Sequence, residues 1–328
     1  MKLLVLGGTE FVGRAVVEAA TARGWDVTVL NRGSKAVPEG VTALRGDRKA
    51  PGGLDALGGG EWDAVVDTWS WAPRVVRDSA RALAGRAGSY IYISSRSVYT
   101  YPMARGANED WPVVEASPDD GDDVEYPRAK AGGELAAVES FGDRAVLVRA
   151  GLILGPYENI GRLPWWLTRI AKGGPVLAPG PADLPIQFVD ARDLAEWSLT
   201  AAERGLSGPY DMISPPEHAT MRQILEECVR VTGSDADLRW LPPEPILAAG
   251  VEPWTDLPIW LAPGEVHDAF HMSDVSKVIA AGLHCRPVAE TIEDTWTWLQ
   301  SIGGKAPLRP DRPSVGLDPA VEAELLNG

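Results

Sequence analysis

Cysteine is scarce in this sequence of 328 residues. Only Cys228 and Cys285 occur, and they form no CxxC pair and no cluster with histidine. Two isolated cysteines supply neither a disulfide framework nor the ligands of a structural zinc site. We therefore expect no metal centre, and a reducing, cytoplasmic location.

Basic residues are also in short supply, because 31 Lys and Arg stand against 46 Asp and Glu and leave a formal net charge of −15. Such a charge repels phosphodiester backbones, so we expect no nucleic acid partner. No apolar run reaches 18 residues, and the run Leu3–Leu6 is too short for a signal peptide. We expect no membrane association and a small-molecule substrate; a homodimer is compatible with the sequence.

The first half of the chain alternates short apolar runs with helical patterns, which predicts βαβ units. The runs are rich in Val, Ile and Leu, as in parallel strands covered on both faces. The sequence therefore predicts an α/β fold with a Rossmann-type doubly wound parallel sheet. The expected strands are 2–6, 26–30, 41–44, 64–67, 89–94 and 145–149, and the expected helices are 12–23, 74–83 and 128–140.

The amino-acid composition changes after Gly155-Pro156, where prolines and tryptophans become frequent. We assign residues 1–155 to a dinucleotide-binding domain. A strand-then-helix pattern indicates that the chain returns to it at about 186–206. Residues 156–185 and 207–328 then form a smaller, interleaved C-terminal substrate lobe and tail, with a short helix at 319–326.

A glycine-rich turn joins the first strand to the first helix. It reads Gly7-Gly8-Thr9-Glu10-Phe11-Val12-Gly13. In this context the glycines permit a tight turn, and the helix N-terminus offers its free N–H groups to a pyrophosphate. Glu10 stands where the usual fingerprint has a glycine, so we expect its carboxylate to turn away and to pair with Arg14.

The second strand ends without the acidic residue that binds the 2′-hydroxyl of NAD. Asn31, Arg32 and Lys35 stand there instead, and two cations suit a 2′-phosphate. This predicts NADP(H) over NAD(H), although a solvated basic turn is the alternative. Asp47, with Arg48, would accept from the adenine amino group or cap a helix. The predicted cofactor contacts are Gly7, Thr9, Glu10, Phe11, Val12, Asn31, Arg32, Lys35, Asp47, Arg48, Thr68, Trp69 and Lys130.

The residues that carry chemistry follow the fifth strand. Ser94 and Ser95 end that strand, and Tyr126 and Lys130 open a helix thirty residues later. Four residues apart, the phenol and the amine share a helix face, and a nearby ammonium favours the phenolate. Pro127 disfavours the α conformation of the residue before it, which places Tyr126 at the helix N-cap.

With the glycine turn, these residues resemble the short-chain dehydrogenase/reductase superfamily, in its extended or atypical, epimerase/dehydratase-like branch. The segments Arg149–Pro156 and Gln187–Ala195 extend the resemblance. It implies that Tyr126 is the general acid/base. It also implies that Lys130 lowers the pKa of Tyr126 and binds the nicotinamide ribose, and that Ser95 orients the substrate.

The resulting prediction is an NADP(H)-dependent oxidoreductase that interconverts a carbonyl and a secondary alcohol on a small, ring-containing metabolite. The alternatives are an epimerase or dehydratase whose bound cofactor is transiently reduced, and a non-catalytic cofactor sensor or RNA-binding relative. Leu152 replaces the asparagine with which extended members hold nucleotide sugars, which disfavours that substrate class. The acidic run 119–125 either forms a solvated loop or creates a local electric field that favours cationic or neutral substrates over anionic ones. The substrate candidates are Trp71, Arg96, Tyr99, Asn159, Arg162 and Trp166.

Overall fold

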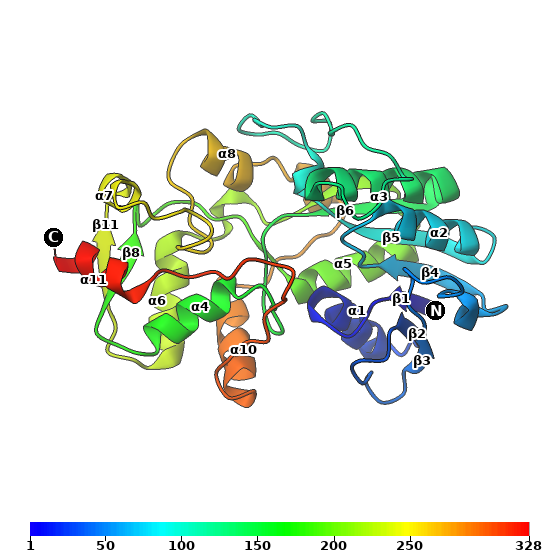
Figure 1. The fold of residues 1–328 in the computed structure, drawn as a ribbon, viewed down its shortest axis with the longest axis horizontal. Helices are drawn as coiled ribbons and strands as arrows, with labels where there is room; N and C mark the ends of the chain where they lie inside the picture. Colours follow the sequence, from blue (N-terminus) through cyan, green and yellow to red (C-terminus); the bar gives the residue numbers. More distant parts are fainter. Residues whose placement is uncertain (328) are drawn as a thin grey trace.

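Seven parallel strands form the sheet of the larger lobe in a computed structural model that describes residues 1–327 (Figure 1). Their order is β10-β6-β5-β4-β1-β2-β3, which contains the Rossmann order 3-2-1-4-5-6. The predicted fold class is confirmed. The strands are β1 (Lys2–Leu6), β2 (Asp26–Asn31), β3 (Thr42–Arg45), β4 (Trp62–Asp67), β5 (Ala87–Ser95), β6 (Ala145–Ala150) and β10 (Gly208–Met212).

Alternate residues of these strands enter two different cores. Leu3 and Val5 pack with α1 (Phe11–Ala22) and α5 (Ala191–Arg204) on one face. Leu4 and Leu6 pack with α2 (Pro73–Leu83) and α3 (Tyr126–Phe141) on the other. Because both faces are covered, a central strand such as β1 carries a continuous apolar run, Leu3–Leu6, without polar alternation.

Within the predicted return segment 186–206, the helix α5 packs against the main sheet, but the expected strand does not join it. Only Val189–Asp190 is a strand there, β9, and it pairs with β7 (Ile153–Leu154) outside the main sheet. The segment that joins the main sheet is β10, which pairs with β6 and lies within the range assigned to the second lobe. Val275 and Val278, at α9 (Ser276–Ala280), also pack into the first lobe's core.

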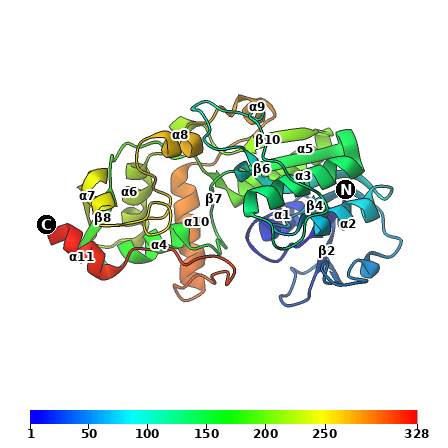
Figure 2. The same cartoon turned by 45° about the horizontal axis from the view of Figure 1, so that its top comes forward.

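The smaller lobe is mostly helical and lies beside the carboxyl ends of the main strands (Figures 1 and 2). Its core holds Trp166 and Trp260, both fully buried. It contains α4 (Arg162–Ile170), α6 (Met221–Thr232), α7 (Pro243–Ala248), α8 (Glu265–His271), α10 (Val288–Ser301) and α11 (Pro319–Asn327), and the pair β8 (Pro175–Pro179) and β11 (Asp237–Leu241).

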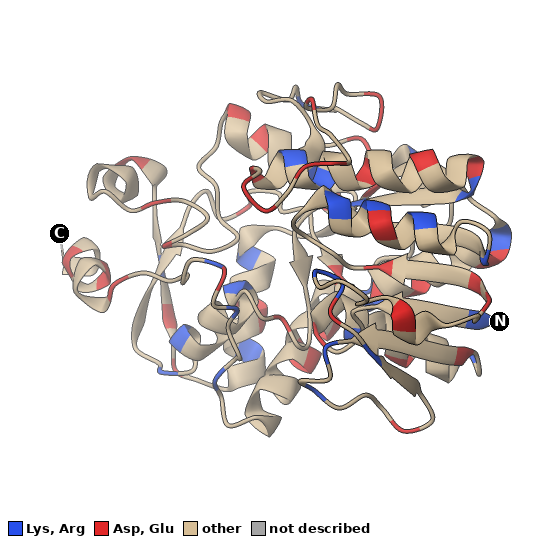
Figure 3. Ribbon diagram, turned by 45° about the vertical axis from the view of Figure 1, so that its right-hand side comes forward, with Lys and Arg blue, Asp and Glu red and all other residues tan. Residues whose placement is uncertain are grey.

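Acidic residues are spread over both lobes (Figure 3). Within residues 1–327, no helix has the length and apolar character needed to cross a membrane. Between α10 and α11 the chain runs from the smaller lobe toward the first lobe and back, which Figure 1 shows in orange and red.

Candidate active site

A cavity of about 1180 Å³ opens at the carboxyl ends of the sheet strands, between the two lobes. Single small-ligand pockets usually enclose about 300 to 1,000 Å³, so this cavity has room for a dinucleotide and a substrate. Every predicted site residue lines it except Lys35 and Trp166. Trp166 lies in the second lobe's core, where its indole N–H donates to the Pro258 carbonyl at 2.7 Å, so the predicted substrate contact is wrong.

The glycine turn is shaped to receive a pyrophosphate. Gly7 has a φ of +122°, and a Cβ added to Gly13 would lie 2.7 Å from the Gly8 nitrogen. Glu10 is the N-cap residue of α1, but its side chain makes no capping hydrogen bond, and the first turn contains no acidic residue. The free N–H groups at this helix end therefore remain available to an anion, and the residues present fit a dinucleotide.

The predicted pair of Glu10 with Arg14 is wrong. Arg14 bonds to Glu18 at 2.7 Å, one turn further along the same helix face. The Glu10 carboxylate lies 2.8 Å from the Lys35 ammonium and accepts a hydrogen bond from the Asn159 amide at 2.9 Å. Because Asn159 precedes α4, this contact ties the glycine turn to the second lobe.

The turn after β2 leaves one cation available. Asn31 Oδ1 accepts from the Gly33 N–H at 2.7 Å, which shapes the turn. Arg32 is exposed and lines the cavity. Lys35 is exposed too, but its ammonium is held by Glu10. Asp47 Oδ1 accepts from the Lys49 N–H at 3.0 Å, which closes the turn after β3, and Asp47 lines the cavity.

The guanidinium of Arg48 is bound inside the protein and does not point into the cavity as a free cation. It binds Asp67 through two hydrogen bonds of 2.7 and 2.6 Å, and both side chains are almost fully buried. Asp67 also accepts from the Tyr90 hydroxyl and from the Trp69 N–H. The side chain of Arg48 thus fixes the end of β4, while Thr68 and Trp69 after it line the cavity.

The two serines that end β5 have different surroundings. Ser94 is buried and donates to Glu134 at 2.6 Å, and Glu134 is itself bound by Arg149. Ser95 is half-buried and lines the cavity; its Oγ accepts from the Ser97 N–H and donates to the Ser97 Oγ, both at 3.1 Å. The Ser95 hydroxyl is thus bound only to a neighbouring serine at the cavity, whereas Ser94 belongs to a buried network of charged groups.

Tyr126 is the first residue of α3 and is half-buried at the cavity wall. The predicted N-cap position is wrong by one residue, because Glu125 accepts the first helical hydrogen bond, from the Ala129 N–H. Pro127 then occupies the second position of the helix, where its missing N–H leaves no bond unmade. The Trp71 ring meets the Tyr126 ring edge-on at a centroid distance of 5.8 Å.

Lys130 is 2% exposed, and its Nζ donates to the carbonyls of Trp69 and Ile93 at 2.7 Å each. Burial lowers the pKa of Lys130 to about 7, because lost hydration outweighs the attraction of Asp67. An ammonium has three N–H donors, so one remains for a ribose hydroxyl.

The remaining substrate candidates divide into two groups. Asn159 and Arg162 face the cavity from the second lobe. Arg96 and Tyr99 line it too, but their polar groups bind Asp211, and Arg149 donates to the Tyr99 hydroxyl. These two residues brace the end of β5 against β10, and Arg96 also donates to the Ala269 and Phe270 carbonyls of α8 in the smaller lobe. Their polar groups are already used.

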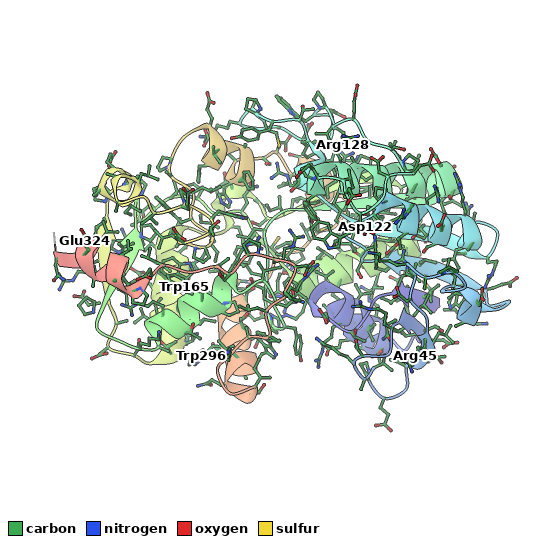
Figure 4. The ribbon with its side chains drawn as sticks, viewed as in Figure 1. Arg45, Asp122, Arg128, Trp165, Trp296 and Glu324 are labelled. Atoms are coloured by element: carbon green, nitrogen blue, oxygen red, sulfur yellow. The ribbon has the colours of Figure 1, made fainter. Side chains whose placement is uncertain are left out.

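The acidic run before Tyr126 is largely paired with cations. Asp119 bonds to Arg77, Asp120 lies 3.7 Å from Arg128, and Asp122 bonds to Lys49 at 2.9 Å. Asp122 and Arg128 are labelled in Figure 4. This pairing weakens the field that the sequence suggested for selecting cationic substrates.

The C-terminal tail supplies site residues that sequence reasoning missed. Arg309, Pro310, Asp311 and Arg312 line the cavity. Asp311 accepts from the Trp71 indole at 3.0 Å, and the Arg312 guanidinium lies 4.6 Å from the Tyr126 ring centroid. Two arginines in a proline-containing tail are the only sequence signal, and they do not indicate where the tail folds back.

Comparisons with known proteins identify a family and a shared fold. A sequence profile described as the NAD dependent epimerase/dehydratase family matches residues 3–212. The chain is 26% identical over 275 residues to the uncharacterized protein YbjS of Escherichia coli (strain K12), which covers 74% of this chain and 78% of that one. It is also 24% identical over 255 residues to the chloroplast stem-loop binding protein of 41 kDa b of Arabidopsis thaliana. That alignment covers 71% of this chain and 63% of the plant protein, which is less than two thirds of its length.

The fold is similar to that of the UDP-glucuronic acid 4-epimerase from Bacillus cereus, solved in complex with NAD. The TM-score is 0.65 at 16% sequence identity, and the match covers 92% of this chain and 99% of that one. At this identity the likeness concerns the fold alone.

Proposed function

The chain belongs to the NAD-dependent epimerase/dehydratase family, and we propose that it binds NADP(H) and catalyses a redox-neutral epimerisation or dehydration of a small hydroxylated metabolite. The observation that carries this proposal is the convergence of Ser95, Tyr126 and Lys130 on one cavity beside the glycine turn. The sequence alone favours a net oxidoreductase. Membership of this family supports the redox-neutral alternative better.

A bound nicotinamide ring would supply reversible hydride transfer at the substrate carbon. Tyr126 takes the proton of the substrate hydroxyl as that carbon is oxidised and returns it as the carbon is reduced, so proton and electron pair both balance. Ser95 holds the substrate oxygen by a hydrogen bond. Lys130, fixed by two carbonyls, binds the ribose and presents positive charge to this end of the cavity.

Retention of the cofactor between the two half-reactions is supported by contacts that cross the cleft. Asn159 of the second lobe donates to Glu10 of the glycine turn, and the Arg309 N–H donates to the Asn159 carbonyl at 3.0 Å. These contacts join the glycine turn to the second lobe and the tail, and we expect them to slow cofactor release.

The test is cofactor content followed by turnover. Purified protein is denatured, and the released nucleotide is quantified by mass spectrometry; we expect close to one NADP(H) per chain. A panel of hydroxylated sugars and sugar acids is then followed by NMR and by the absorbance of the reduced nicotinamide. Inversion or loss of water without net absorbance change supports the proposal, whereas one reduced nicotinamide formed or lost per product shows a net oxidoreductase.

We predict that Arg32→Gln weakens NADPH binding by about 10- to 100-fold, because a hydrogen bond between charged partners contributes about 1.5–3 kcal/mol. NADH affinity should not change. Glu10→Gln should strengthen NADPH binding, because Lys35 loses its carboxylate partner and becomes free for the 2′-phosphate. Dissociation constants are measured by the fluorescence of the reduced nicotinamide.

Lys172→Gln is the matched control for Arg32→Gln, because it removes one exposed cation at the distant end of α4. An equal loss of affinity for both cofactors in Arg32→Gln, or tighter binding of NADH than of NADPH by the wild type, contradicts the NADP(H) assignment.

We propose that the partner of this protein is a small molecule and not RNA, despite its similarity to the chloroplast stem-loop binding protein. The net charge is −15, and the acidic residues are spread over both lobes. RNA binding requires a basic face on which phosphates can replace their counterions.

A further inference from the structure

The segment Arg309–Arg312, here called the strap, is fixed across the cleft at both ends. The Arg309 N–H donates to the Asn159 carbonyl, and Asp311 accepts from the Trp71 indole. The Arg312 N–H donates to the Arg309 carbonyl, which makes the strap a closed turn. Downstream, Leu317 packs into the second lobe's core. The strap is therefore held in place by contacts to both lobes.

The strap places one positive charge, that of Arg312, beside Tyr126 without an ion-pair partner among residues 1–327. Arg309 binds Asp311 through two hydrogen bonds of 3.0 and 2.6 Å, so these two charges cancel. The pair lowers the pKa of Asp311 to about 2, chiefly through the hydrogen bond from Arg309. Arg312 has no carboxylate within ion-pair distance in the described part of the chain, and its buried Nε has no hydrogen-bond partner.

Arg312 shares the missing partner with Arg162, whose buried Nε also has no hydrogen bond among the residues described, but differs from the arginines that are almost fully buried. Arg48, Arg96 and Arg149 each bind a carboxylate. The Arg312 guanidinium instead rests on aromatic faces, 4.6 Å from the Tyr126 ring centroid and 5.0 Å from that of Trp71. A cation over an aromatic face is attracted by the negative charge of that face, so the Tyr126 ring contributes to holding the guanidinium.

Lys130 does not supply the cation over the face of the Tyr126 ring. Its Nζ donates to two main-chain carbonyls, and within residues 1–327 no hydrogen bond joins it to Tyr126. Burial also lowers the pKa of Lys130 to about 7, so part of its positive charge is lost at neutral pH. Arg162 on α4 and Arg312 in the strap are other cations beside Tyr126, and Arg312 lies over the face of its ring.

We infer that Arg312 is a positioning residue that stabilises the phenolate of Tyr126 from the face of its ring. This inference rests on the proposed role of Tyr126 as general acid/base. A cation on a ring face is attracted weakly by a neutral phenol and strongly by a phenolate, and this difference favours deprotonation. The other titratable or charged groups around Tyr126 are Lys130 on its own helix, Tyr92 on β5, Arg162 on α4, Arg309 and Asp311 in the strap, and Asp122 in the preceding loop.

The experiment titrates the Tyr126 phenol directly and needs no substrate. The ultraviolet absorbance of phenolate is recorded against pH, and subtraction of the Tyr126→Phe titration isolates one of the seven tyrosines. In Arg312→Gln the midpoint should rise by on the order of one pH unit, the effect of removing one charge at close range in a medium of mixed polarity. Arg312→Lys should restore part of the shift.

Arg312→Met separates charge from packing, because it keeps an apolar stem over the rings; the same upward shift is expected. Arg222→Gln is the matched control, since Arg222 lies over the Trp240 ring at 5.5 Å in the other lobe, and it should leave the midpoint unchanged. An unchanged midpoint in both Arg312→Gln and Arg312→Met, with wild-type near-ultraviolet circular dichroism, overturns the inference. Full turnover by Tyr126→Phe would instead overturn the proposed function and leave the titration result standing.

Discussion

Replacement of Tyr126 by phenylalanine is expected to lower kcat by about 10²- to 10⁴-fold, the contribution typical of a positioned general acid or base. The substitution removes only the hydroxyl, so the ring contacts with Trp71 and Arg312 remain. NADPH affinity should be retained, because the glycine turn and the end of β2 are untouched. The measurements are initial rates on the substrate found in the panel, and a fluorescence titration with NADPH.

Tyr101→Phe is the matched control for this prediction. Tyr101 is 57% exposed at the rim of the same cavity, so loss of its hydroxyl should leave kcat within the error of measurement. A Tyr126→Phe enzyme with wild-type kcat would show that a different group transfers the proton. A parallel loss of NADPH binding would show that the hydroxyl contributes to the cofactor site.

The first half of the fold could be predicted because its strands carry a strong local signal. The apolar run Leu3–Leu6 is buried on both faces of the sheet and makes up all of β1 except its first residue. The strand β10, by contrast, reads Gly-Pro-Tyr-Asp-Met and lies at the sheet edge. Proline is tolerated at an edge, where its missing N–H breaks no ladder, so this strand lacks the apolar run on which the prediction depends.

The candidate site could be predicted where a motif lies on one βαβ unit, and could not where distant segments meet. Arg14 is the nearest cation to Glu10 along the helix, but Asn159, 149 positions away, and Lys35 are its partners. The contact between Trp71 and Asp311 joins residues 240 positions apart. Side-chain spacing along one element carries no information about such contacts, because the packing of the whole chain determines them.

Trp166 illustrates the opposite error. Its neighbourhood in the sequence suggested a cavity wall, since clustered tryptophans commonly line ligand pockets. Its indole is instead fully buried and satisfied by the Pro258 carbonyl. An aromatic residue at helical spacing packs in a core more often than it contacts a ligand, and Trp166 belongs to the core of the second lobe.

Substitution of Arg48 by methionine is expected to lower the free energy of unfolding by about 3–5 kcal/mol, because it leaves a buried carboxylate without its cation. Asp67 is fully buried, and the bidentate pair to Arg48 compensates its charge. The measurement is equilibrium denaturation in urea. Arg222→Met, which breaks an exposed ion pair with Asp183, should change the unfolding free energy little.

The same substitution should reach the active site through the backbone. Asp67 accepts from the Trp69 N–H, and the Trp69 carbonyl accepts from Lys130. When Asp67 loses Arg48, its carboxyl group protonates or moves, and the carbonyl that holds Lys130 moves with it. Arg48→Met should therefore weaken NADPH binding even at temperatures where the protein remains folded. A variant with wild-type stability would show that water can solvate Asp67, and a destabilised variant with unchanged NADPH affinity would show that the end of β4 is held by the sheet alone.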